Sequence, residues 1–254
     1  MNKEEYLKVS TLTYREYCDY LQKKYGLPEY DYYTPDFVKN DQYNGHKNTR
    51  TNDGLFIHHI FEDHGIDLSK EPFASKNPWE WQKRENLCFS DYLEHLFLHV
   101  LICQYPSKNA NKGEAVGIGG VVNWLVPALN DFYSGLVPEK KYEKVCFAKI
   151  ANDRDVYVLL VKRFLKYQEE HNTPHKRFKP SRVFRSFHKN IWDATKNEEL
   201  YREIDPSWEP PFSDEECWAH QGGDTCLTGG VYVEDICPNC LNPVCLLDCD
   251  EEEI

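Results

Sequence analysis

The stretch Leu55-Phe56-Ile57-His58-His59-Ile60-Phe61 places two adjacent histidines among β-branched and aromatic residues. This composition predicts a short buried β-strand. Because neighbouring side chains on a strand point to opposite faces, the two imidazoles cannot easily bind one ion together. The doublet therefore indicates a division of labour, in which one histidine binds a metal ion and the other acts as a base.

A second pair of histidines follows in the stretch from Ser90 to Cys103. Apolar residues and histidines recur there at helical spacing, and Ser90 is placed as an N-cap, so we predict an amphipathic helix. His95 and His99 then lie one turn apart on one face and can converge on one cation. With one further ligand from the strand, the site has three ligands and keeps positions open for water and a substrate oxygen. An open site of this kind is typical of catalysis.

The order of these motifs resembles that of the HNH, or ββα-metal, endonucleases. The resemblance rests on Gly-Leu-Phe-Ile-His-His-Ile at 54–60, Glu-Asn-Leu at 85–87 and His-x-x-x-His at 95–99, and the span from 54 to 99 is about a fifth of the chain. It implies that His58, His95 and His99 hold a divalent metal. It also implies that His59 is the general base and that Asn86 supports the loop that aims the base. The spacing is closest to that of the colicin-type nucleases.

Two features differ from the usual pattern of that family. Many members have proline three residues after the second histidine, where this chain has Glu62. A carboxylate at this position could orient a histidine, as carboxylates do around metal ligands, or be a solvated surface acid. The segment between His59 and Asn86 is also long and contains Trp79 and Trp81. We expect an inserted loop whose tryptophans pack against the protein, with stacking on an unpaired base as the alternative.

The motif predicts hydrolysis of a phosphodiester bond. An imidazole with a pKa near ~6.5 can deprotonate water, and a cation can offset charge at phosphorus and on the leaving oxygen. We expect one catalytic Mg, Mn, Ni or Zn ion in an endonuclease of bacterial or phage type. The resemblance favours DNA as substrate, with RNA as the alternative. The competing interpretation is a closed structural metal site in a non-catalytic protein-interaction or regulatory module, whose acidic tail mimics nucleic acid.

The net charge of −12 is concentrated near the carboxyl end of the chain. Residues 203–254 contain 14 Asp and Glu and no Lys or Arg, whereas residues 1–202 carry 30 basic against 28 acidic residues. The acidity therefore does not exclude a nucleic-acid partner. From Lys162 to Lys189, basic residues alternate with phenylalanines, which is typical of a nucleic-acid track or of an amphipathic helix. The candidate contacts to nucleic acid are Arg50, Lys176, Arg177, Lys179, Arg182 and Arg185.

Six of the ten cysteines lie after residue 216, which favours a local metal site over a disulfide framework. Cys237 and Cys240 form a Cys-x-x-Cys knuckle, and Cys217 and Cys226 are the preferred partners for a structural zinc. A flexible tail with free thiols is the alternative. The acidic run at 248–253 is expected to be solvated, or to contact the basic track or a protein partner. The other residues that could complete the zinc site are Cys245, Cys249 and His220.

The predicted fold is α+β and mainly helical, with a ββα-metal core embedded in helices and a Cys-rich acidic tail. In Gly117-Ile118-Gly119-Gly120 the glycines predict close packing against another helix rather than a phosphate loop, because no Lys-Ser or Lys-Thr follows. No apolar run approaches the ~20 residues of a membrane helix and no secretory signal is recognised, so we expect a cytoplasmic protein without a membrane partner. The expected segments are a helical and loop region (1–52), the core (53–104), a helical region with the basic track (105–202) and the tail (203–254).

Overall fold

The computed structural model describes residues 1–37, 50–171, 198–204 and 206. Over these ranges the fold is α+β and mainly helical, as the sequence predicts, with a two-stranded sheet. The chain divides into two units, one made of Met1–Leu129 and Val137–Thr173 and the other of Asn130–Leu136 and Pro174–Ile254. All residues of the candidate site belong to the first unit. The segment boundaries predicted at residues 52, 104 and 202 stay predictions.

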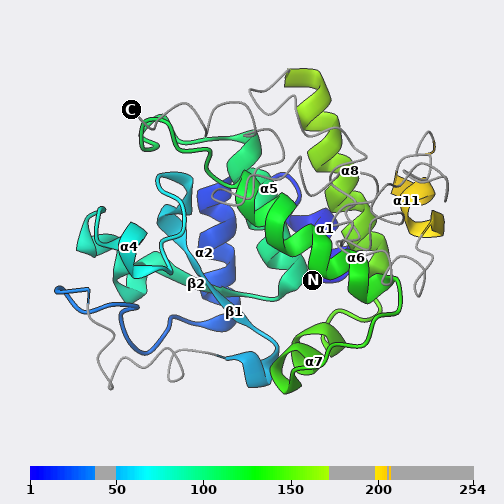
Figure 1. Ribbon diagram of the computed structural model, residues 1–254, viewed down its shortest axis with the longest axis horizontal. Helices are drawn as coiled ribbons and strands as arrows, with labels where there is room; N and C mark the ends of the chain where they lie inside the picture. Colours follow the sequence, from blue (N-terminus) through cyan, green and yellow to red (C-terminus); the bar gives the residue numbers. More distant parts are fainter. Residues whose placement is uncertain (38–49, 172–197, 205, 207–254) are drawn as a thin grey trace, which may run out of the picture. The chain divides into compact units, whose positions relative to one another are not determined.

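Helices make up most of the first unit (Figure 1). None of the helices in the described ranges combines the length and the apolar character needed to cross a membrane. The α-helices of the described residues, in order, are α1 (Lys3–Val9), α2 (Tyr14–Tyr25), α4 (Glu71–Ala74), α5 (Tyr92–Gln104), α6 (Val126–Tyr133), α7 (Lys141–Ala148), α8 (Arg154–His171) and α11 (Glu198–Ile204). The strands and shorter helical turns are η2 (Thr51–Asp53), β1 (Phe56–His59), η3 (Ile60–Asp63), η4 (Trp79–Gln82), η5 (Arg84–Asn86), β2 (Leu87–Ser90) and the π-helix η6 (Gly120–Leu125).

The two strands form an antiparallel pair in which His58 lies opposite Cys88. The strand expected around the histidine doublet is present, and the chain turns into η3 directly after His59. All four residues of β2 are buried, because α2 packs against this strand. Helix α5 begins two residues after β2 and also contacts β1 (Figure 1). Residues 56–104 therefore have the strand, strand, helix order that the motif predicts.

Helix α5 starts one residue later than expected. Its N-cap is Asp91, whose side chain accepts a hydrogen bond from the Glu94 backbone while the Glu94 carboxylate accepts one from the Asp91 backbone. Ser90 instead ends β2, so its prediction as N-cap is wrong. The helix is also not amphipathic, since every residue from Tyr92 to Ile102 is buried. Helices α2 and α8 and the π-helix η6 pack around it, which makes α5 the centre of the unit.

The glycine-rich segment before η6 packs closely against α5, as its sequence predicts. Gly117 adopts a φ of +81°, and the side chain of Ile102 leaves no space for a methyl group there. Gly120 lies directly against the imidazole ring of His99. The wider turn of a π-helix begins at this residue and gives way to α6 one residue before Pro127. The absence of a side chain at Gly120 thus allows the backbone of η6 to pack against the buried His99 ring.

Gly120→Ala should destabilise the protein by about 1–3 kcal/mol, because a methyl group there would run into the His99 ring and overpack the core. Gly119→Ala is the matched control: its backbone is ordinary right-handed helix, and its methyl group would meet only Asn123 Nδ2, at 3.9 Å. Urea unfolding followed by circular dichroism measures both free energies. Equal values for the two variants would contradict this packing.

Candidate metal centre

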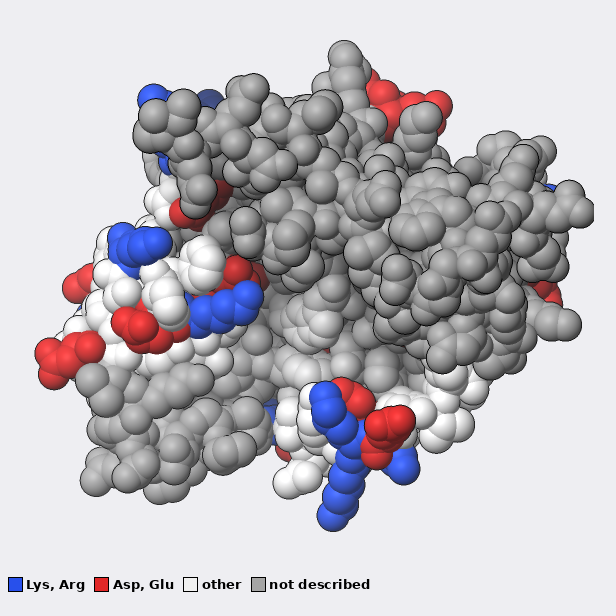
Figure 2. Space-filling model, in the orientation of Figure 1, with Lys and Arg blue, Asp and Glu red and all other residues white. Residues whose placement is uncertain are grey.

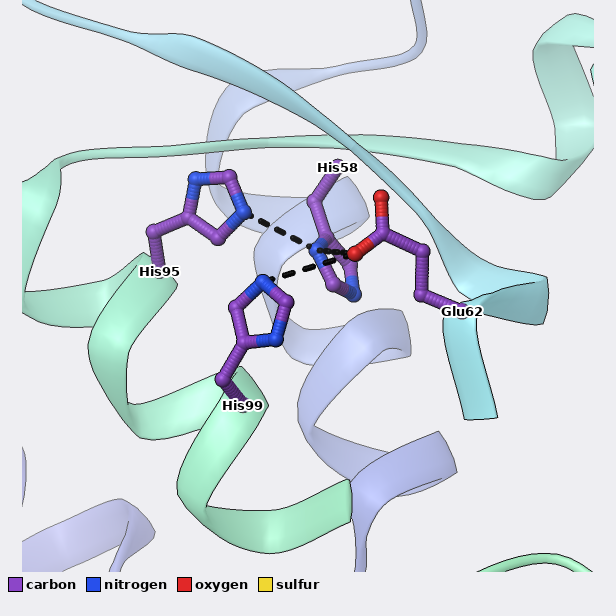
Figure 3. A group of neighbouring side chains, drawn as sticks. All are labelled: His58, Glu62, His95 and His99. Carbon is purple, nitrogen blue, oxygen red and sulfur yellow. Dashed lines mark hydrogen bonds and ion pairs between the residues drawn. The ribbon is translucent and has the colours of Figure 1, made fainter. Parts of the chain in front are cut away.

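Four side chains from three elements of the first unit point toward one another (Figure 3). Strand β1 supplies His58, the turn η3 supplies Glu62, and adjacent turns of α5 supply His95 and His99. One potential ligand atom from each residue lies within 4.8 Å of the others. The structure therefore brings together all three predicted metal ligands and adds a carboxylate. This His/Glu cluster could hold a metal ion.

The separations within the cluster match those around a single small cation. His58 Nδ1 lies 3.1 Å from His95 Nε2 and 3.6 Å from Glu62 Oε2, and His99 Nε2 lies 3.4 Å from the same carboxylate oxygen. Ligands bound tetrahedrally at ~2.0–2.1 Å from zinc are about 3.3–3.4 Å apart. These three separations are close to that spacing, and all four ligand atoms lie within 4.8 Å of one another, so the donor set could hold one divalent ion.

Hydrogen bonds on the far sides of two rings fix which nitrogen faces the cluster. His58 Nε2 lies 2.8 Å from the Tyr14 hydroxyl, which in turn donates to the Ile60 carbonyl at 3.0 Å. When the hydroxyl donates its proton to Ile60, His58 Nε2–H donates to Tyr14 and Nδ1 presents its lone pair, which is the tautomer that a metal at Nδ1 requires. His99 Nδ1–H donates to the Gly117 carbonyl at 3.1 Å, which leaves Nε2 unprotonated. The contact with Gly117 requires this tautomer of His99, and the contact with Tyr14 is compatible with the corresponding tautomer of His58.

Burial sets the protonation states that a metal ion requires. Loss of solvation lowers the pKa of His58 to about 3, lowers that of His95 strongly and lowers that of His99 as well. Burial alone would raise the pKa of the Glu62 carboxyl, but the surrounding imidazoles, His58 foremost, outweigh it and hold the pKa below its usual range. At neutral pH the cluster therefore presents three unprotonated imidazoles and one carboxylate.

The second histidine of the doublet is buried beside the cluster and does not belong to it. His59 Nε2 lies 3.0 Å from Gln82 Oε1, and Gln82 Nε2 donates to the Leu68 carbonyl at 3.3 Å. This second bond fixes the amide with its oxygen toward His59, so Nε2 carries the ring proton. His59 Nδ1 faces Glu62, whose Oε1 lies 3.7 Å away. The doublet thus divides as expected, one ring in the cluster and one beside it.

Asn86 lies outside the cluster and braces the turn that orients His59. Its Nδ2 donates to the Glu80 carbonyl at 2.7 Å. Glu80 and Gln82 both belong to the turn η4, so Asn86 fixes the segment from which Gln82 contacts His59. The resemblance implies this kind of support, and a part for Asn86 in catalysis stays a prediction.

The long segment between His59 and Asn86 folds against the protein. Trp81 stacks on Phe61 with 5.1 Å between ring centroids, and Trp79 Nε1 donates to the Tyr33 carbonyl. The expected packing of the two tryptophans is therefore confirmed. Of the two interpretations of Glu62, the solvated acid is wrong, because this side chain is only 16 % exposed and faces the histidines.

Arg50, one of the candidate contacts to nucleic acid, is engaged within the protein. It donates to Asp53 and to the Tyr25 carbonyl, and its guanidinium lies over the Phe89 ring. Basic and acidic side chains mix on the described part of the face in Figure 2. The other candidate contacts to nucleic acid lie outside the described residues: they are Lys176, Arg177, Lys179, Arg182 and Arg185. The same is true of the four cysteines of the predicted zinc site, Cys217, Cys226, Cys237 and Cys240.

No protein-family model, curated protein or solved structure matches this chain. Its function is therefore inferred from the residues of the centre and from their geometry.

Three residues of the centre have roles that the sequence did not reveal. Glu62 follows His58 at the same four-residue spacing that separates His95 from His99, so an acid at this distance from the doublet was a usable signal. Gln82 and Tyr14 reach the two histidines from distant segments and carry no local pattern. Their contacts appear only in the folded chain.

His99→Ala should weaken divalent-metal binding by at least about 100-fold, because it removes a predicted ligand. This loss is larger than is typical when a residue that only hydrogen-bonds to a ligand is removed. His64→Ala is the matched control, because its ring contacts Asp63 and Ser107 outside the cluster. Calorimetric titration of the metal-free proteins with Ni²⁺ or Zn²⁺ measures both affinities. Equal affinity in wild type and His99→Ala would contradict the ligand assignment.

Tyr14→Phe should lower metal affinity by about 10–100-fold, because His58 would lose the hydroxyl that orients its ring and fixes its tautomer. Tyr20→Phe removes a hydroxyl from the same helix that contacts Glu5 instead, and should leave the affinity unchanged. The same titration serves for both variants. A similar loss in Tyr20→Phe would assign the effect to α2 as a whole rather than to the contact with His58.

Proposed function

We propose that this protein is a divalent-metal-dependent endonuclease that hydrolyses phosphodiester bonds, preferentially in DNA. Three features support the proposal: the strand, strand, helix order of residues 56–104, the convergence of His58, His95 and His99, and a further histidine beside them. Preference for DNA over RNA follows the resemblance of the motif to the HNH endonucleases.

The observation that carries the proposal is the position of His59. A structural metal site needs only its ligands, whereas hydrolysis also needs a base close to the reacting phosphorus. His59 Nδ1 is buried, has no hydrogen-bond partner in the described part of the chain, and lies 3.7 Å from the Glu62 carboxylate, which also faces the metal ligands. Its neighbours Gln82 and Tyr32 restrain the ring, the latter through an edge contact at 4.5 Å. This side chain would take the proton from the attacking water.

The metal ligands supply the remaining requirements of phosphodiester hydrolysis. A divalent cation held by this centre would polarise the phosphoryl group and offset negative charge on the departing oxygen. Three imidazoles with one carboxylate favour zinc, nickel or manganese over magnesium, because nitrogen donors suit transition metals. His58 and His99 keep their orientation through Tyr14 and Gly117, which holds the site ready before substrate arrives.

The second candidate function is a non-catalytic module in which the metal stabilises the fold. The observation in its favour is the closure of the centre: the three histidine ligands are at most 6 % exposed, and Glu62 provides a fourth donor. Four protein ligands around one ion are typical of structural zinc. The two candidates differ in what they require of His59, which only the enzyme needs as a base.

His59→Ala should reduce metal-dependent nicking of supercoiled plasmid by about 100-fold or more while metal affinity stays near that of wild type, because a base is lost and a ligand is not. Nicking is measured with Mg²⁺, Mn²⁺, Ni²⁺ and Zn²⁺ and with a chelator, and metal affinity by calorimetry. His64→Ala, outside the centre, is the control for loss of an imidazole.

Two results would reject the endonuclease. One is wild-type inactivity with every metal on DNA and RNA, and the other is full activity of His59→Ala. Inactivity combined with a large rise in Tm on metal binding would favour the structural module.

A further inference from the structure

The Glu62 carboxylate lies between the predicted metal ligands and the proposed base of the active site. Its Oε2 is 3.4 Å from His99 Nε2 and 3.6 Å from His58 Nδ1, which is where a ligand of the same ion would be. Its Oε1 is 3.7 Å from His59 Nδ1, the proposed base. One side chain therefore lies close to two of the predicted metal ligands and also faces the nitrogen of the proposed base.

We propose that Glu62 is an exchangeable ligand that closes the centre at rest and leaves when a phosphate group of the substrate takes its place. The proposal rests on the proposed function, since it names how substrate enters that centre. Displacement of this one carboxylate opens a position beside the metal for a phosphoryl oxygen and frees His59 Nδ1 to act on water. Substrate binding and activation of the base are thereby coupled.

The surroundings of the four ligands make Glu62 the one that can leave. His58 is tied to Tyr14, and His99 to Gly117. The ion-pair contacts of the Glu62 side chain, within the described part of the chain, are to the histidines alone. It is also the most accessible of the four, with 16 % of its side chain exposed against 0 % for His58 and 7 % for His99.

Its position in the chain favours movement as well. Glu62 belongs to the short turn η3, whereas His58 is paired into the sheet and the other two ligands lie within α5. A long side chain on a turn can swing away by rotation about its own bonds, with the backbone in place. The histidines have no such freedom, because their rings are enclosed by the core.

The chemistry of the incoming group fits the exchange. A phosphodiester and a carboxylate each carry one negative charge and bind metals through hard oxygen atoms. Replacing one by the other conserves both the charge and the donor type of the centre, so the buried site gains no uncompensated charge. An uncharged carbonyl oxygen would not satisfy this condition, and the structure therefore favours anionic oxygen ligands of the phosphate class.

The test uses the visible absorption of the Co²⁺-loaded protein, which reports the coordination of the metal directly and does not depend on nuclease activity. Inorganic phosphate is titrated into wild type, Glu62→Ala, Glu62→Gln and Asp63→Asn. Asp63 is the matched control, since it is the neighbouring acid on the same turn but binds Arg15 and His64 rather than the cluster.

Glu62→Ala should change the Co²⁺ spectrum before phosphate is added and should then bind phosphate about 10-fold more tightly or better, because the competing closed state is gone. Glu62→Gln, which keeps the size of the side chain, should shift in the same direction. Wild type should approach the phosphate-bound spectrum of Glu62→Ala only at high phosphate, and Asp63→Asn should follow wild type.

Three outcomes would overturn the proposal. An unchanged Co²⁺ spectrum in Glu62→Ala would show that the carboxylate is not a ligand, and unchanged phosphate affinity would show that it does not compete. Loss of Co²⁺ from both Glu62 variants would make Glu62 an indispensable structural ligand. Absence of plasmid nicking together with the expected phosphate response would reject the endonuclease and leave the exchangeable ligand standing, so the two failures are distinguishable.

Discussion

Burial of three unprotonated imidazoles around one carboxylate is the constraint on which the rest of the first unit depends. A buried nitrogen without a hydrogen-bond or metal partner destabilises the fold by about 1–3 kcal/mol, so each imidazole needs a partner for both of its ring nitrogens. His58 and His99 have Tyr14 and Gly117 on their outer sides. His95 Nδ1 has no hydrogen-bond partner in the described part of the chain, and a metal bound at Nε2 would offset that cost.

The same constraint explains the unusual character of α5. A helix with two histidines and a glutamate among its buried residues cannot be stabilised by an apolar face alone. Its first turn is closed by reciprocal bonds between Asp91 and Glu94, and the Glu94 carboxylate is further bonded to Lys24 and Tyr25. At its middle, η6 approaches through Gly120, the only residue type whose backbone can lie against the His99 ring. The helix, its N-terminal cap and the glycine contact together hold His95 and His99 in their positions on α5.

The sequence predicted the site where functional residues follow the spacing of a single helix or strand. The four-residue spacing of His95 and His99 predicts two ligands on one helix, and the doublet predicts one ligand on a strand; the structure brings these rings together. Prediction stopped where contacts join distant segments. Tyr14 is 44 residues from His58, and Gln82 is 23 residues from His59, so no local period connects them. The Ser90 cap failed for a local reason, since Asp91 and Glu94 form a better one.

Glu62 decides whether a buried centre of this kind can also be catalytic. Many HNH endonucleases, which the motif resembles, have proline three residues after the second histidine, and a proline side chain offers no donor atom to a metal. This chain has a carboxylate there. A buried centre with four protein ligands can bind substrate only if the fourth ligand can be replaced. A fourth histidine would exchange a neutral donor for an anion and change the charge of a desolvated site, at a large cost. A carboxylate exchanges for a phosphodiester without that change. The charge balance of the centre thus favours entry of a phosphate while the three histidines, His59 and their supporting bonds stay in place.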